Sequence, residues 1–414
     1  MRRFNLTLKE SMRHVLFAIH GMSAPTYVKP TNPSSTGESS MTTQYPRVLF
    51  VLKFREDTYG GAEKENGNWG DGGEDARRPL SSGLFNSARL VVAMLERHGV
   101  PVKLVHVQDN NYIHREAVKF NADVVIIEAF WVVPEKFDEL YRVDPRIKYI
   151  IRNHSETPFL SNEGIAFDWM LRYVQKPNVF MSANAPRMLE ESRFLMQLEN
   201  PDWTHDLVTL KTPYLPNYYP TEGCPTSSPI PDPFDEFINI GCFGAVRPLK
   251  NTLEQAIGAM KFAKRMNRRL RFHINGGRIE MGGQPILKNL TQLFSHFPDY
   301  ELINHPWMDH VEFRKLVASM DLMTQVSFSE TFNIVAADAV TQNILTITSS
   351  EVPWSARILQ ANPVSSSDIA DAMHRGWELK QSNPTFNPSL LGLSHYNKES
   401  EKAWLSYLAD LAAI

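Results

Sequence analysis

The stretch INIGCFGAVRPLKN, residues 238–251, decides the fold prediction. Its opening residues, 238–243, form an apolar run of the length that a buried strand has. Gly244 then permits a tight turn, and the residues that follow predict a helix over 252–266. A buried strand that leads directly into a helix is the repeating unit of a parallel α/β sheet.

The same unit recurs along the rest of the chain. Further strands are predicted near residues 47–52, 102–107, 123–127, 148–151, 178–182, 207–211, 270–275, 300–304, 321–326 and 344–348. Helices are predicted near residues 84–95, 112–120, 164–174, 185–198, 286–296, 310–319, 331–342 and 402–408. Alternating strands and helices imply right-handed crossovers and parallel sheets covered on both faces. We therefore predict an α/β fold with two doubly wound Rossmann-like domains that face each other across a cleft.

A proline-rich break separates the two runs of alternation. Prolines 225, 229, 231 and 233 lie between Pro220 and Phe237, a composition typical of an interdomain linker. The amino end has a short apolar stretch at residues 15–19 and then a Pro/Ser/Thr-rich segment, which predicts a disordered leader. The expected boundaries are a leader at residues 1–41, a first domain at 42–220, a linker at 221–236, a second domain at 237–390 and a final helix at 391–414 that packs back on the first domain.

Composition excludes several classes of protein. The chain has 414 residues, 43 Lys plus Arg and 46 Asp plus Glu, so its net charge of −3 gives no general attraction to nucleic acid or an anionic membrane. Its two cysteines cannot build a disulfide framework or a Cys-rich zinc site, which favours a cytoplasmic protein. No apolar run reaches the roughly 20 residues that span a bilayer, so we expect a soluble protein without a transmembrane segment.

The turn after the strand at residues 238–243 is the first candidate site. Arg247 and Lys250 stand three positions apart just before a predicted helix. Helix amino ends attract anions through their free N–H groups and their dipole. Arg247 could grip a diphosphate with its planar fork and Lys250 as a point charge, although such cations are also common in solvated loops.

The second candidate site is residues 327–339, where a strand leads through a polar turn into a helix. Glu330 stands at the expected helix start and Asp338 follows eight residues later, so both acids are predicted on roughly one helix face. They could grip separate hydroxyls of an extended ligand. The alternative is a capping Glu and a solvated Asp, but Asp338 has apolar neighbours on both sides in the sequence.

These two motifs resemble those of GT-B glycosyltransferases, and the chain is most similar to the large retaining family 4. That family has a Gly-Arg…Lys turn followed by a Glu-x7-Glu motif. The first is matched by Gly244, Arg247 and Lys250, with tighter spacing, and the second by Glu330 and Asp338, where Asp replaces the second Glu. The resemblance covers roughly residues 46–360.

The resemblance implies a role for each matched residue. Arg247 and Lys250 would stabilise the diphosphate leaving group, Glu330 would hold sugar hydroxyls, and His154 would lie near the sugar or its phosphate. Asp338 would take the ribose hydroxyls. The remaining donor-binding residues would be Gly83, Gly244, Trp307, Met308, Thr331, Phe332 and Asn333.

The implied activity is hexosyl or pentosyl transfer from a nucleotide-sugar to an acceptor hydroxyl, with retention. The sequence has no Asp-x-Asp motif at a strand end, so we expect no metal, and the nucleotide-sugar is a co-substrate rather than a cofactor. Two alternatives remain open: a sugar-nucleotide epimerase of the same fold, and a non-catalytic nucleotide-sugar binding module.

The sequence leaves the acceptor unidentified. A small molecule or a glycan is the favoured class, and modified DNA is an alternative suggested by the basic run at residues 264–271. Such runs are more often solvated helix faces. The long loop at residues 59–78 is interpreted either as an acceptor lid or as a disordered segment.

Overall fold

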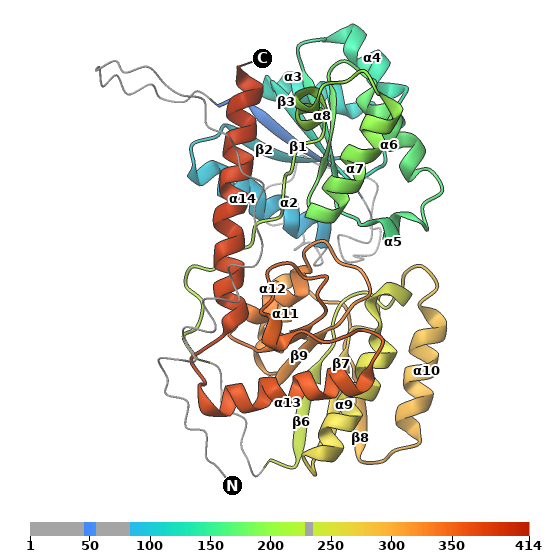
Figure 1. The fold of residues 1–414 in the computed structure, drawn as a ribbon, viewed down its shortest axis with the longest axis vertical. Helices are drawn as coiled ribbons and strands as arrows, with labels where there is room; N and C mark the ends of the chain where they lie inside the picture. The colour runs from blue at the N-terminus through green and yellow to red at the C-terminus, as the bar shows by residue number, and fades with distance from the viewer. Residues whose placement is uncertain (1–44, 55–82, 228–234, 414) are drawn as a thin grey trace, which may run out of the picture. The chain divides into compact units, whose positions relative to one another are not determined.

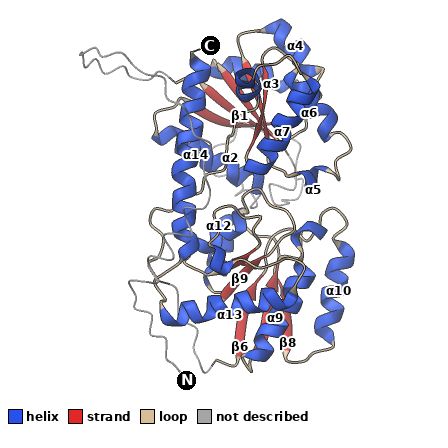
Figure 2. Cartoon of the chain, viewed as in Figure 1, coloured by secondary structure: helices blue, strands red, loops and turns tan. Residues whose placement is uncertain are grey.

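A computed structural model of the chain describes residues 45–54, 83–227 and 235–413 (Figure 1). The predicted leader at residues 1–41, the loop at 59–78 and the centre of the predicted linker, residues 228–234, lie outside the described residues. The described chain contains two parallel five-stranded sheets. Figure 2 shows the strands of each sheet lying between helices, which confirms the predicted fold class of two parallel α/β domains.

The first sheet has the strand order β2-β1-β3-β4-β5. Its strands are β1 (Val48–Lys53), β2 (Val102–Val107), β3 (Val124–Glu128), β4 (Lys148–Asn153) and β5 (Val179–Ala183). The helices of this half are α2 (Gly83–Arg97), α3 (Tyr112–Phe120), α4 (Lys136–Val143), α5 (Thr157–Leu160), α6 (Ala166–Val174), α7 (Pro186–Glu199) and α8 (His205–Lys211).

Strand β1 shows why both faces of this sheet are covered. Its side chains alternate between the faces because the strand period is two residues. Val48 and Phe50 pack in a cluster with α2, whereas Leu49 and Val51 pack in a second cluster with α3 and α4. Every residue of β1 except Lys53 is buried, as expected for the central part of a parallel sheet.

The second sheet has the strand order β10-β9-β6-β7-β8. Its strands are β6 (Phe237–Gly241), β7 (Arg269–Ile274), β8 (Tyr300–Asn304), β9 (Leu322–Gln325) and β10 (Thr346–Thr348). Its helices are α9 (Thr252–Arg265), α10 (Gln284–Ser295), α11 (His310–Ala318), α12 (Ile334–Val340) and α13 (Ser366–Ser382), with 3-10 turns η2 (Pro248–Lys250) and η3 (Arg357–Leu359). One face packs mainly on α9 and α13, and the other on α11 and α12.

One predicted strand was wrong, and two helices were not predicted. Residues 207–211, predicted as a strand, belong to helix α8, where the Thr204 hydroxyl accepts a hydrogen bond from the Leu207 amide at 3.2 Å and caps the helix. Helix α13 was not predicted, although Ser365 and Asp368 have the spacing of a capping box. Helix α4 was also missed.

The last helix, α14 (Pro388–Ala412), connects to the first sheet. Trp404 is fully buried beside Phe50 of β1, with ring centroids 5.8 Å apart. Its indole N–H donates to the Pro216 carbonyl at 2.8 Å. Nearer its start, α14 contributes Leu393 to an apolar cluster that also contains Leu90 of α2 and Ala336 of α12. Helix α14 therefore packs on elements of both halves.

We expect Trp404→Ala to destabilise the protein by about 3–5 kcal/mol, because it deletes a large buried ring and leaves a cavity. Chemical denaturation of the full chain measures this loss of unfolding free energy. Lys402→Ala, an exposed position on the same helix, is the matched control and should change stability by less than about 0.5 kcal/mol. Equal stabilities for the two variants would contradict the assigned packing of α14.

Candidate functional site

A cavity of about 420 Å³ lies where the carboxyl ends of strands from both sheets converge. Ligands of open α/β sheets bind at such strand ends. Residues of both halves line it, and they include every site residue that the sequence predicted. These are Gly83, His154, Gly244, Arg247, Lys250, Trp307, Met308, Glu330, Thr331, Phe332, Asn333 and Asp338.

Lys250 and Glu330 form an ion pair in this cavity. The Lys250 ammonium lies 2.5 Å from Glu330 Oε1, and the side chains are 15% and 8% exposed. Lys250 ends the turn η2, and the backbone amide of Phe328 donates to the Leu249 carbonyl at 2.9 Å. This bond holds the two loops together, so the ammonium and the carboxylate stay in contact.

Arg247 is paired with a different carboxylate, that of Glu280. Arg247 Nη1 lies 3.2 Å from Glu280 Oε2, while Arg278 Nε lies 2.7 Å from Glu280 Oε1. A short parallel bridge between Val246 and Ile279 brings these side chains together. One carboxylate thus holds two guanidinium groups at the edge of the cavity.

The loop before α12 differs from the sequence prediction. Helix α12 begins at Ile334, so Glu330 lies in the preceding loop and does not share a helix face with Asp338. The reason is Asn333, which has φ of 62° and caps the helix by accepting from the Ala336 amide at 2.9 Å. Its Nδ2 donates to Glu330 Oε1 at 3.1 Å, so the cap residue also orients the acid.

Asp338 is a buried acid rather than a solvated one, with 2% exposure. Its Oδ1 accepts the Tyr219 hydroxyl at 2.5 Å and lies 2.6 Å from His310 Nε2. Burial and the neighbouring Asp338 carboxylate raise the pKa of Tyr219, so this phenol stays protonated as the donor. Both contacts use Oδ1, so Oδ2 is the oxygen that can accept a hydrogen bond from a ligand.

Trp307 and Met308 follow β8 and line the cavity beside Arg278. The Arg278 guanidinium carbon lies 5.1 Å from the centre of the Trp307 ring, within cation–π distance. Trp307 is half-buried. Its ring forms a flat surface beside the guanidinium groups.

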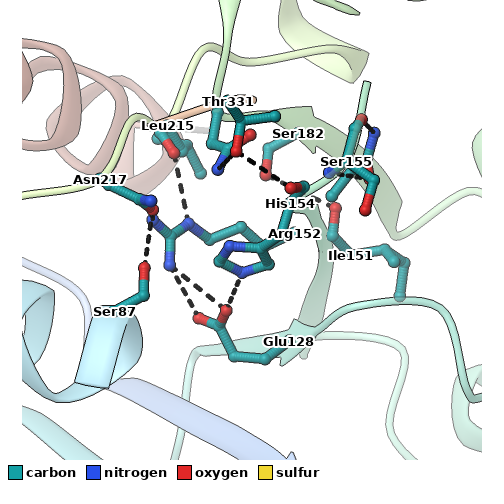
Figure 3. Close-up of polar contacts among 12 residues, drawn as sticks. Ser87, Glu128, Ile151, Arg152, His154, Ser155, Ser182, Leu215, Asn217 and Thr331 are labelled. Atoms are coloured by element: carbon teal, nitrogen blue, oxygen red, sulfur yellow. Dashed lines mark hydrogen bonds and ion pairs between the residues drawn. The ribbon is translucent and has the colours of Figure 1, made fainter. Parts of the chain in front are cut away.

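His154 belongs to a buried polar network that Figure 3 shows. Glu128 ends β3 and Arg152 lies beside it in the register of β4. Arg152 Nη1 lies 3.2 Å from Glu128 Oε1, and His154 Nε2 contacts the other carboxylate oxygen. Glu128 and Arg152 are both completely buried. The carboxylate therefore fixes the orientation of the histidine ring, which lines the cavity.

The charge states of this network follow from burial and pairing. Burial lowers the pKa of His154, Arg152 lowers it further, and Glu128 opposes both. The pKa of Glu128 lies below its usual value: burial raises it, but Arg152 and His154 together outweigh burial. At neutral pH the network is thus a carboxylate paired with a guanidinium beside a neutral imidazole. Nε2–H then donates to Glu128, and Nδ1 carries the lone pair.

Direct hydrogen bonds join the two halves at the cavity. Thr331, in the loop before α12, donates to the His154 carbonyl at 3.0 Å and accepts from Asn184 Nδ2 at 3.2 Å. Arg187 of α7 contacts Glu351, which follows β10, at 2.7 Å. These contacts place the loop that carries Glu330 against the loop that carries His154.

Sequence reasoning missed several residues of this site. Glu128, a charged residue that ends the apolar run of β3, gave a signal that could have found it. Glu280, Tyr219 and His310 gave no such signal, because they reach the site through tertiary contacts that no local pattern encodes.

Among the described residues, no group of three or more His, Cys, Asp or Glu side chains has a metal-binding arrangement. Within the same ranges, no helix has the length and apolar character to cross a membrane.

We expect Glu128→Gln to cost about 3–5 kcal/mol at neutral pH, because Arg152 is left as an uncompensated buried charge. The folded protein binds the Glu128 proton less tightly than the unfolded chain does. The stabilisation by the carboxylate is therefore present above pH 4.5 and is lost as the pH falls below that value. Urea denaturation across this range should show the difference from wild type shrinking with acid.

The matched control for this test is Glu139→Gln. Glu139 is 57% exposed and pairs with Lys136, so its loss should cost less than about 1 kcal/mol. A Glu128→Gln difference that is small at neutral pH, or independent of pH, would contradict the proposed charge state.

No family model and no curated protein sequence matches the chain. Solved structures share its architecture. A trehalose-6-phosphate protein from E. coli bound with UDP-2-fluoro glucose is 12% identical with a TM-score of 0.56, and the match covers 87% of this chain and 99% of that one. A sucrose-phosphate synthase from Thermosynechococcus elongatus is 12% identical with a TM-score of 0.53, covering 89% and 98%.

A trehalose-6-phosphate synthase studied for glycosyl transfer with retention is 14% identical with a TM-score of 0.54, covering 80% of this chain and 84% of that one. These matches confirm the resemblance to GT-B glycosyltransferases at the level of the fold, and the likeness to family 4 within it is approximate. The chain therefore has the GT-B fold that these sugar-transferring enzymes share.

Proposed function

We propose that this protein is a glycosyltransferase that moves a hexosyl or pentosyl group from a nucleotide-sugar to an acceptor hydroxyl, with retention and without a metal ion. One observation carries the proposal: the Arg247 and Lys250 cations and the Glu330 acid line a single cavity at the carboxyl ends of both sheets. The fold adds support, since one of its solved examples binds UDP-2-fluoro glucose.

The diphosphate of the donor would bind between Arg247 and Lys250. Each cation is now neutralised by a carboxylate, Glu280 or Glu330. A diphosphate carries more charge than one carboxylate and offers several acceptor oxygens, so it can replace these partners. Glu330, released from Lys250, is then free to accept hydrogen bonds from the hydroxyls of the transferred sugar.

The transfer step needs no group that the chain lacks. The bond between the anomeric carbon and the diphosphate oxygen breaks, and its electron pair stays on the diphosphate, where Arg247 and Lys250 stabilise the negative charge. The acceptor oxygen bonds to the same face of the anomeric carbon, and its proton passes to the leaving phosphate oxygen. Positioning and electrostatic stabilisation supply the catalysis.

The other donor contacts are the ones that the resemblance to GT-B glycosyltransferases implies, and all three residues line the cavity. Asp338 Oδ2 would accept from the ribose hydroxyls, and the flat Trp307 ring would lie beside the base. His154 Nδ1 would accept a hydrogen bond from a sugar hydroxyl.

Cys224 and Cys242 are both free thiols, in keeping with a cytoplasmic enzyme.

A thermal-shift screen of UDP-, GDP-, ADP- and dTDP-sugars tests donor binding. A donor present at about 100 times its dissociation constant should add about 2.7 kcal/mol to the free energy of unfolding. Arg247→Ala should abolish this shift and slow transfer about 10²–10³-fold, because one fixed donor to the leaving group is lost. Arg265→Ala, a half-exposed arginine of α9 paired with Asp371, should change neither value.

Product analysis separates the proposed activity from its alternatives. Transfer or slow hydrolysis of the stabilising donor supports a glycosyltransferase. Conversion of the donor into a second nucleotide-sugar without any acceptor would instead identify an epimerase. Binding without any turnover would identify a non-catalytic binding module.

Glu330→Gln tests whether the acid competes with the diphosphate for Lys250. Removing the carboxylate charge frees the ammonium, so the nucleoside diphosphate alone should bind about 5–10-fold more tightly, a gain of about 1–1.4 kcal/mol. Transfer should slow at the same time, because the sugar hydroxyls lose a charged hydrogen-bond acceptor and keep the weaker, neutral amide oxygen. Calorimetry and initial rates measure the two effects, and weaker diphosphate binding or an unchanged rate would contradict the assignment.

A further inference from the structure

The two halves contribute very different surfaces to the cavity. The second half supplies three cations, Arg247, Lys250 and Arg278. Among the described residues of the first half, Lys53 is the one lysine or arginine that lines the cavity. Arg247 of the second half also reaches this surface, since its guanidinium carbon lies 4.9 Å from the centre of the Phe159 ring, but it is already paired with Glu280. Within the described residues, a ligand group that lies against the first half therefore meets Lys53 and one guanidinium whose charge is already compensated.

Arg152 lies close to the cavity but adds no available positive charge to the surface of the first half. It is completely buried and pairs with Glu128. Its remaining nitrogens donate to the Leu215 and Pro216 carbonyls at 3.3 Å and to Asn217 Oδ1 at 2.5 Å. The guanidinium is fully engaged by protein groups and has no donor left for a phosphate.

Two carboxylates of the first half line the cavity, those of Glu156 and Glu163. Glu156 is 3% exposed and accepts from Arg187 Nε at 2.9 Å. Arg187 is shared, because its other nitrogens contact Glu351 at 2.7 and 3.3 Å. One guanidinium between two carboxylates gives Glu156, Arg187 and Glu351 together a net charge of about −1. This charge repels the phosphate of an acceptor that lies beside Glu156.

Aromatic rings are also part of this surface. Phe85, Phe130 and Phe159 are half-buried and line the cavity. The ring of His106 lies 5.4 Å from that of Phe85, and burial lowers the pKa of His106, so the imidazole is neutral. These flat apolar faces suit the C–H face of a sugar ring or an aromatic ring.

Asn217 supplies a neutral hydrogen-bond donor to the same surface. Its Oδ1 accepts from Arg152 Nη2 and from the Ser87 hydroxyl at 2.7 Å. Because a guanidinium can only donate, the amide orientation is fixed, and Nδ2 has no hydrogen bond to another described residue. Asn217 lines the cavity, so this amide can donate to an acceptor hydroxyl.

We propose that the first half of the cavity binds an uncharged, hydroxyl-bearing ring as acceptor and disfavours phosphorylated sugars. The proposal rests on the glycosyltransferase activity proposed above. The ring packs on Phe85 and Phe130, Asn217 donates to a hydroxyl, and Glu156 accepts from another. This preference would set the chain apart from two solved structures of the same fold, a trehalose-6-phosphate synthase and a sucrose-phosphate synthase, whose names contain phosphorylated sugars.

A paired acceptor assay tests this preference. With the donor that stabilises the protein most, transfer is measured to free, methyl and phenyl glycosides of common hexoses and pentoses. The same assay is run with the matching sugar 6-phosphates and with a single-stranded oligonucleotide that carries 5-hydroxymethylcytosine. We expect the neutral acceptor of at least one pair to exceed its phosphorylated partner by tenfold or more in kcat/KM, about 1.4 kcal/mol.

Faster transfer to the phosphorylated partners, transfer to the oligonucleotide alone, or no transfer to any neutral acceptor would each overturn the proposal. Donor-induced thermal stabilisation and donor hydrolysis without acceptor are measured in parallel. Their presence keeps the proposed function intact when the acceptor proposal fails, and their absence shows that the proposed function itself fails.

Variants then locate the preference on named residues. Phe85→Ala should lower kcat/KM for the neutral acceptor at least tenfold, because the acceptor ring loses the side chain on which it packs. Glu156→Gln should raise the relative use of the sugar phosphate, because it removes a like charge. Glu190→Gln, an exposed acid of α7 outside the cavity, is the control and should leave the ratio unchanged. Equal ratios in the Glu156 and Glu190 variants would contradict the electrostatic part of the proposal.

Discussion

The buried guanidinium of Arg152 organises the site. It joins β4 to β3 through Glu128 and to the segment at residues 215–217 through two carbonyls and an amide. The same segment receives the indole N–H of Trp404, which anchors helix α14. Burying one charge pair is costly unless every donor is satisfied, and here the surrounding groups satisfy it. The network thereby holds His154 and Asn217 at the cavity wall.

Charge compensation governs the cavity itself. The cations proposed to hold a diphosphate are already paired, Lys250 with Glu330 and Arg247 with Glu280. An unpaired cation at such low exposure would be expensive, so these carboxylates stabilise the site before a ligand arrives. Donor binding as proposed would then be an exchange of partners, which favours a diphosphate over a singly charged anion.

The sequence predicted the parts of the structure that local patterns encode. Apolar runs located most strands of both sheets. Two polar segments that follow such runs were also found: the turn with Arg247 and Lys250, and the loop with Glu330. Helix α8 was misread because Leu207, Val208 and Leu210 look like a short strand. Tertiary contacts set the rest: Asn333 starts α12 late and separates Glu330 from Asp338, and only the strand register places Glu128 beside Arg152.

The central claim is that a nucleotide-sugar diphosphate binds between Arg247 and Lys250. A crystal structure with the stabilising donor, or its nucleoside diphosphate, tests this most directly. Our account predicts phosphate oxygens within hydrogen-bond distance of both cations, with Glu330 no longer bonded to Lys250. A diphosphate bound elsewhere, with the Lys250–Glu330 and Arg247–Glu280 pairs intact, would contradict it.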